Sequence, residues 1–172
     1  MNVTRGATLI PLGHQTESGG GRLWVRLAVT DGALVRMQVE DDPRHEFTST
    51  RMVPAKYADV VEALTDWSTR IASRFDWTTH PGFPEIGTAF QRSVWSELCR
   101  VPWGESLGYS GLAQKVGRPG AARAVGQAVG ANPWAPLIPC HRVLAAHHGL
   151  GGYAQGTRIK AKLLAIEEIA FR

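Results

Sequence analysis

The residues best suited to chemistry surround Cys140, which is followed directly by His141 and Arg142. Three prolines between residues 133 and 139 stiffen the approach to the cysteine, as expected where a side chain must be aimed. Neighbouring positive charge favours the thiolate, which is the nucleophilic form of cysteine. Because adjacent side chains tend to point apart, we expect a water molecule to carry the proton from Cys140 to His141. The segment predicts an activated nucleophile.

A histidine that acts as a base usually needs a third group to orient it, and Glu167 is the candidate. It falls near the end of a predicted helix that Thr157 is expected to cap. Glu167 lies beside Leu163 in helical projection, at the edge of an inner stripe formed by Ile159, Leu163 and Ile166. The ordinary role of such a glutamate is a solvated charge, and the residues alone favour that role.

Other chemistries fit the pattern less well. One cysteine with scattered histidines lacks the spacing of metal ligands, so we expect no metal. The glycines of residues 149–152 have no strand-then-helix context, and we expect no nucleotide cofactor. With only Cys99 and Cys140 there is no disulfide framework, which favours a reducing cytoplasm, and Cys99 is expected in the core. A Cys-His hydrolase or acyltransferase, and a DNA-binding module with an incidental cysteine, remain open.

The second half of the chain is predicted to be helical. Thr88–Gln91 forms a capping box for a helix whose buried stripe is Phe90, Val94, Trp95, Leu98 and Cys99. A helix capped by Ser110 runs to Val116, and a turn at Gly117-Arg118 leads to a second helix over Gly120–Ala131. This is the pattern of a helix-turn-helix.

The second of those helices has two faces. Ala122, Val125 and Val129 cluster on one side, and Arg123, Ala124, Gln127 and Ala131 cluster on the other. A face of small residues permits close approach to another surface. It fits equally a helix packed tightly inside the protein, and this helix alone does not decide between the two.

The first half is predicted to be a small sheet with one helix. Strands are expected over Ala7–Pro11, Leu23–Val29 and Leu34–Val39, with a hairpin turn at Asp31-Gly32 and a helix over Lys56–Phe75. A linker rich in proline over Thr79–Ile86 divides the chain into domains 1–84 and 85–172. The fold class is therefore α/β with two domains.

Charge is divided unevenly between these halves. Residues 1–84 hold nine Lys/Arg and ten Asp/Glu (net −1), and residues 85–172 hold ten and five (net +5). The second half would attract a polyanion. No apolar run is long enough to cross a bilayer, and the N-terminus lacks the layout of a signal peptide, so we expect a cytoplasmic protein without a membrane partner.

Several motifs in order resemble the O6-alkylguanine-DNA alkyltransferase family (methylated-DNA–protein-cysteine methyltransferases). The resemblance extends from about Gly87 to Glu168. It rests on the following segments: Phe90-Gln91, Val94-Trp95, Ala121–Gly126, Asn132-Pro133, Ile138–Val143, Gly152-Tyr153 and Leu163–Glu167.

The resemblance implies a small ribonuclease-H-like α/β domain followed by a helical winged-helix domain that carries the reactive cysteine. By position Cys140 would accept the alkyl group, His141 would take its proton through water, and Glu167 would orient the histidine. Asn132 would link the recognition helix to the active-site loop.

The resemblance also implies a double-stranded DNA partner bound in the minor groove with weak sequence preference, by a protein expected to be a monomer. Tyr109 would contact the DNA backbone and help to protonate the departing guanine. Arg123 would enter the stack when the damaged nucleotide rotates out, with Ala122, Ala124 and Gln127 beside it. Tyr153, Val143 and Ala154 would line the base pocket.

The implied reaction is one irreversible alkyl transfer from O6-alkylguanine, and from O4-alkylthymine, to the protein. Ala135 stands where several relatives have Pro, and Ala154 where relatives often have Ser or Arg, so the pocket rim and one contact are expected to differ. Mammalian members carry a zinc site in the N-terminal domain. Residues 1–84 hold no cysteine, so we expect no such site here.

Overall fold

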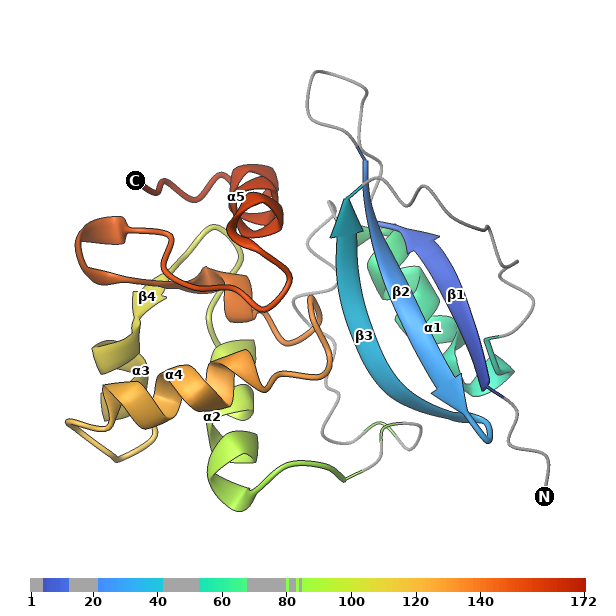
Figure 1. Ribbon diagram of the computed structural model, residues 1–172, viewed down its shortest axis with the longest axis horizontal. Coiled ribbons are helices and arrows are strands. Elements are labelled where there is room, and N and C mark those ends of the chain that lie inside the picture. Colours follow the sequence, from blue (N-terminus) through green and yellow to red (C-terminus); the bar gives the residue numbers. More distant parts are fainter. Residues whose placement is uncertain (1–4, 13–21, 42–52, 68–79, 81–82, 84) are drawn as a thin grey trace. The chain divides into compact units, whose positions relative to one another are not determined.

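The computed structural model describes residues 5–12, 22–41, 53–67, 80, 83 and 85–172. The chain divides into two compact units, Met1–Glu85 and Ile86–Arg172. The first unit holds a three-stranded sheet and a helix, and the second is mainly helical (Figure 1). The expected mixed α/β class is confirmed. Half of the predicted linker over Thr79–Ile86 lies outside the described residues.

The sheet of the first unit is antiparallel, with strand order β1-β2-β3. Asp31 (φ 50°) and Gly32 (φ 74°) form the tight turn between β2 and β3, as the Asp-Gly pair predicts. Alternate side chains of β2 are buried, so one face of the sheet is covered. All three predicted strands are confirmed and are somewhat longer than expected: β1 (Arg5–Pro11), β2 (Leu23–Thr30) and β3 (Ala33–Asp41).

Helix α1 (Ala58–Thr65) packs its apolar side against this sheet (Figure 1). The expected helix over Lys56–Phe75 begins later than predicted, because Ala55–Tyr57 is a 3-10 turn, and α1 ends at Thr65. The Thr65 hydroxyl donates to the Val61 carbonyl (2.8 Å), a local bond of the kind that weakens a helix. The final part of the predicted helix lies outside the described residues.

Helix α2 (Ala89–Cys99) opens the second unit with the predicted capping box, in which Thr88 and Gln91 bond reciprocally. Three members of the predicted stripe are buried: Val94, Trp95 and Leu98. Phe90 and Cys99 are only half-buried, because they lie in the first and last turns of the helix. The expectation that Cys99 is a core thiol is therefore wrong.

The next two helices, α3 (Tyr109–Lys115) and α4 (Ala122–Gly130), are joined by a turn. Ser110 does not cap α3, because the two-residue strands β4 (Leu107–Gly108) and β5 (Val143–Leu144) pair in parallel and the chain leaves β4 directly into the helix. Helix α4 begins later than expected because Gly120 adopts a left-handed conformation (φ 88°). A hydrogen bond from Trp95 Nε1 to the Ala128 carbonyl (2.8 Å) ties α2 to α4.

Helix α5 (Thr157–Ile166) is followed only by a short C-terminal segment, residues 167–172. Its N-cap is Gly156 (φ 96°) and not the predicted Thr157, which is already helical. The inner side of α5 carries Ile159, Leu163 and Leu164, all buried, whereas Ile166 is half-buried. Between α4 and α5 the chain forms two 3-10 turns, Cys140–Arg142 and Ala146–His148. Within the described ranges no helix is both long and apolar enough to cross a membrane.

Candidate active site

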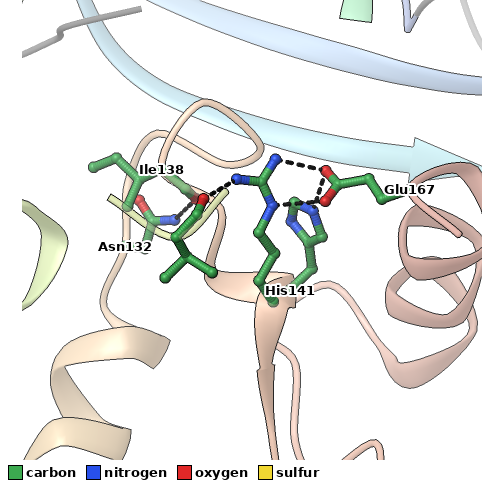
Figure 2. A network of polar contacts seen from close by, with 6 residues as sticks. Asn132, Ile138, His141 and Glu167 are labelled. Carbon is green, nitrogen blue, oxygen red and sulfur yellow. Dashed lines mark hydrogen bonds and ion pairs between the residues drawn. The ribbon is translucent and has the colours of Figure 1, made fainter. Parts of the chain in front are cut away.

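Cys140 begins a buried 3-10 turn and is 6% exposed. Its sulfur accepts a hydrogen bond from Asn132 Nδ2 (3.0 Å). The same amide donates to the Ile138 carbonyl (2.8 Å; Figure 2). Asn132 Oδ1 in turn accepts from the Trp134 amide (2.9 Å). Because Asn132 follows the end of α4, this side chain ties that helix to the segment that carries the thiol.

His141 and Glu167 face each other in the interior, with His141 Nε2 2.8 Å from Glu167 Oε1 (Figure 2). Both side chains are fully enclosed. Helical projection predicted Glu167 at the edge of the buried stripe of α5. The structure places Glu167 at the C-cap of α5, where its side chain is more deeply buried than predicted. The interaction brings together two of the residues that the sequence pointed to.

Arg142 contacts the same carboxylate from another side. Its Nε donates to Glu167 Oε2 (2.6 Å) and its Nη2 to Oε1 (3.0 Å), a bidentate pair that is planar and strong. Its Nη1 donates to the Val101 carbonyl (2.6 Å), and the guanidinium stacks 5.8 Å from the centre of the Trp103 ring. Arg142 therefore fixes Glu167 and anchors the connection between α2 and β4.

These partners decide the ionisation of the two enclosed groups. Burial alone would raise the pKa of Glu167, but interactions with His141 and Arg142 outweigh it and lower the pKa. Burial lowers the pKa of His141 more than Glu167 raises it, so the imidazole is neutral at pH 7. An ionised Glu167 that accepts from Nε2–H leaves Nδ1 as the basic nitrogen of His141.

The thiol itself is held in its neutral form. Burial raises the pKa of Cys140, while the hydrogen bond from Asn132, the nearby Tyr153 hydroxyl and the charge of Lys160 lower it in part. The expectation that Arg142 favours the thiolate is wrong, because its guanidinium is engaged by Glu167. Cys140 therefore needs a base before it can act as a nucleophile.

A pocket of about 330 Å³ opens onto Cys140. Tyr153 and Ala154, both expected at a pocket, form part of its wall, together with Tyr109 and Asn132. Val143, also expected there, is fully buried outside the lining, and its carbonyl accepts from Lys160. The remaining lining residues come from the second half of α4 and from the segment before α5: Gly126, Val129, Gly130, Gly152 and Gln155.

Helix α4 thus has one face toward the pocket and another toward solvent. Arg123, Ala124 and Gln127 are exposed, and Ala122 is half-buried at the start of the helix. These four residues do not line the pocket, so they form a separate surface next to it.

Lys160 is the residue of this site that the sequence reasoning missed. It is fully buried on α5, one helical turn before Leu164. The available signal was the helical spacing of Lys160 from Leu163 and Leu164, which places the lysine on the buried side of α5. In the part of the chain that the structure describes, no three His, Cys, Asp or Glu side chains are grouped as metal ligands would be.

Comparison with known proteins identifies relatives of this chain. A family profile described as the DNA binding domain of 6-O-methylguanine DNA methyltransferase matches residues 89–169. A methylated-DNA–protein-cysteine methyltransferase of Mycobacterium tuberculosis is 34% identical over 158 residues, which cover 92% of this chain and 88% of the relative. The chain therefore belongs to this methyltransferase family, and the resemblance read from its motifs is confirmed.

Two further relatives extend the comparison. The regulatory protein Ada of Salmonella typhimurium is 35% identical over 93% of this chain, which spans about half (50%) of that protein's length. The crystal structure of Mycobacterium tuberculosis OGT in complex with DNA is 31% identical and superposes with a TM-score of 0.62. That superposition covers 94% of this chain and 92% of the other.

The enclosed histidine and carboxylate predict that the second unit loses stability in acid. The lowered His141 pKa contributes stability that is present above its ordinary value of 6.5 and is lost as the pH falls below it. The lowered pKa of Glu167 likewise contributes stability that is lost as the pH falls below the ordinary glutamate value of 4.5. Urea denaturation should show the free energy of unfolding falling between pH 7 and pH 4, by up to about 1.4 kcal/mol per pH unit for each group.

The variant His141→Gln is the matched control for the upper part of this range. It should be less stable than the parent at pH 7, and its stability should change less between pH 7 and pH 5. An equal slope in both proteins would mean that His141 is not held neutral in the folded state.

Proposed function

We propose that this protein repairs alkylated guanine in DNA by one irreversible transfer of the alkyl group to Cys140. The observation that carries the proposal is the pocket onto which Cys140 opens, with two tyrosines in its wall. Its volume of about 330 Å³ lies at the lower end of the range for small-ligand sites. A single base with a small adduct suits a pocket of this size.

The transfer begins with removal of the thiol proton. Neutral His141 takes this proton through a water molecule, and Glu167 stabilises the imidazolium that forms, since the two rest 2.8 Å apart. The thiolate attacks the alkyl carbon, a carbon–sulfur bond forms, and the bond between that carbon and guanine O6 breaks. The electron pair of the broken bond goes to the guanine.

The departing guanine needs a proton, and Tyr109 is placed to help donate it. Its ring forms part of the pocket wall, and burial together with the nearby Cys140 raises its pKa, so the phenol stays protonated at neutral pH. The product on the protein is a thioether. Water does not hydrolyse a thioether, so each molecule acts once.

Access to the pocket requires the damaged nucleotide to leave the duplex. Helix α4 lies in the minor groove with Ala122, Ala124 and Gln127 against the DNA, and Arg123 fills the vacated stack. Support comes from the exposed small residues of α4, from the +5 charge of residues 85–172, and from the Mycobacterium tuberculosis relative crystallised with DNA. Few base contacts are needed, so sequence preference is weak. O4-alkylthymine is a second substrate in this proposal.

We also infer the finer fold description that this function implies. The three-stranded antiparallel sheet with one helix supports a ribonuclease-H-like N-terminal domain. The paired helices α3 and α4, joined by a turn with Gly117 at φ 68°, support a helix-turn-helix within a winged-helix domain.

Intact-protein mass after incubation with duplex DNA that contains O6-methylguanine tests the transfer. One methyl group should appear per protein, and peptide mapping should place it on Cys140. Cys99→Ala should still be modified, whereas Cys140→Ala should bind DNA without modification. Many substrate equivalents consumed per protein would indicate a Cys-His hydrolase, and an unchanged mass would indicate a DNA-binding module.

Replacement of Arg123 tests the extrusion of the nucleotide. Arg123→Ala should slow methyl transfer from duplex DNA, by roughly tenfold or more if the inserted side chain is worth about 1.4 kcal/mol or more of the unstacking cost. Transfer from the same lesion in single-stranded DNA should change far less. Arg100→Ala, an exposed arginine at the C-terminal end of α2, is the control. Equal rates for parent and Arg123→Ala on duplex DNA would contradict the role.

A further inference from the structure

A tight turn between α2 and β4 carries an aromatic side chain that the proposed reaction leaves without a role. The Glu105 amide donates to the Pro102 carbonyl (3.2 Å), so residues 102–105 form a β-turn with Trp103 and Gly104 at its centre. Gly104 has φ 80°, the left-handed conformation that a type II turn requires at its third position. The glycine therefore lets the chain reverse here and leaves Trp103 at the head of the turn.

This turn lies against the buried pair of Arg142 and Glu167. The Trp103 ring is half-buried, and the guanidinium carbon of Arg142 lies 5.8 Å from the ring centre. The Val101 carbonyl, one residue before the turn, accepts from Arg142 Nη1 (2.6 Å). A Cβ added at Gly104 would lie 3.6 Å from the Glu167 carbonyl oxygen. The turn therefore reaches both members of the pair.

An aromatic ring suits this position for two reasons. Its face attracts a guanidinium that lies within about 6 Å of the ring centre, and the flat cation can stack there while its edge bonds a carboxylate. The ring also brings apolar surface to an ion pair that would be weakened by the entry of water. Both effects favour the bidentate geometry of Arg142 on Glu167, whose two hydrogen bonds measure 2.6 and 3.0 Å.

The geometry of Arg142 matters to His141, because both side chains contact the same oxygen of Glu167. Oε1 lies 2.8 Å from His141 Nε2 and 3.0 Å from Arg142 Nη2. A carboxylate held from both sides has little freedom to turn, so the imidazole is oriented as well. Burial is the largest influence on the pKa of His141 and lowers it, and the charge of Arg142 lowers it further. Water entering at Arg142 would weaken both influences.

We propose that Trp103 is a positioning residue for the alkyl transfer, and that the turn over residues 102–105 covers the Arg142–Glu167 pair. Trp103 touches no reacting atom. It acts through Arg142 and Glu167 to hold the His141 ring in place and to keep bulk water from the Glu167 side of that ring. The imidazole then stays in the neutral form that accepts the thiol proton. This inference deepens the proposed function and rests on it only in taking His141 as the base.

The charged groups that act on His141 come from two elements. Glu167 is the C-cap of α5 and Lys160 lies on the same helix, whereas Arg142 belongs to the 3-10 turn that also holds His141. Of these groups, Arg142 is the one that stacks on the Trp103 ring. A change at Trp103 therefore reaches His141 by way of Arg142.

An NMR titration of the protein without DNA tests the proposal, so its failure is distinct from failure of alkyl transfer. In Trp103→Ala the His141 midpoint should rise toward the ordinary histidine value of 6.5, by about half a pH unit, or about threefold in proton affinity. Trp103→Phe, which keeps an aromatic face, should retain the midpoint of the parent. Trp24→Ala is the matched control, because that ring also lies near an arginine, Arg22 (5.9 Å), but in the first unit. A lower melting temperature of Trp103→Ala with an unmoved His141 midpoint would overturn the proposal.

A second variant, Trp103→Leu, keeps the proposal testable in case Trp103→Ala does not fold. Leucine preserves apolar cover but has no aromatic face on which a guanidinium can stack. The hydrogen on Arg142 Nε, which is donated to Glu167 Oε2, should then exchange with solvent about threefold faster or more than in the parent. An exchange rate equal to that of the parent would overturn the proposal and leave Trp103 only as apolar packing.

Discussion

The Glu167 carboxylate is enclosed on all sides, and the rest of the site depends on how its charge is satisfied. Removing such a charge from water costs several kcal/mol, which only well-placed partners can offset. Arg142 supplies two hydrogen bonds and His141 one, at 2.6, 3.0 and 2.8 Å. Because Arg142 also bonds the Val101 carbonyl, the carboxylate holds together the loop after α2, the turn at Cys140 and the end of α5.

This arrangement assigns each neighbouring group a single electrostatic task. The guanidinium of Arg142 offsets Glu167 and has no charge left for the thiol. The imidazole of His141 stays neutral, which is the form that can accept a proton. Lys160, the other buried cation in the described part of this site, donates to three backbone carbonyls.

Local patterns predicted what depends on local structure. The capping box at Thr88 and the turn at Asp31-Gly32 need only neighbouring residues, and both are confirmed. The start of α3 was wrong because Gly108 pairs with Leu144, a contact that no local periodicity reports. The roles of Arg142 and Lys160 were missed for the same reason, since each is decided by partners distant in the sequence. For the family, the ordered motifs around Cys140 were sufficient.

A double-mutant cycle on Arg142 and Glu167 tests most directly whether their buried pair is the interaction on which the site depends. Arg142→Met and Glu167→Gln should each lower the free energy of unfolding by about 3–5 kcal/mol at pH 7, since each leaves its partner uncompensated. The double variant should cost less than the sum of the two, by about 2 kcal/mol or more. Additive losses, or single losses below about 1 kcal/mol, would contradict the account.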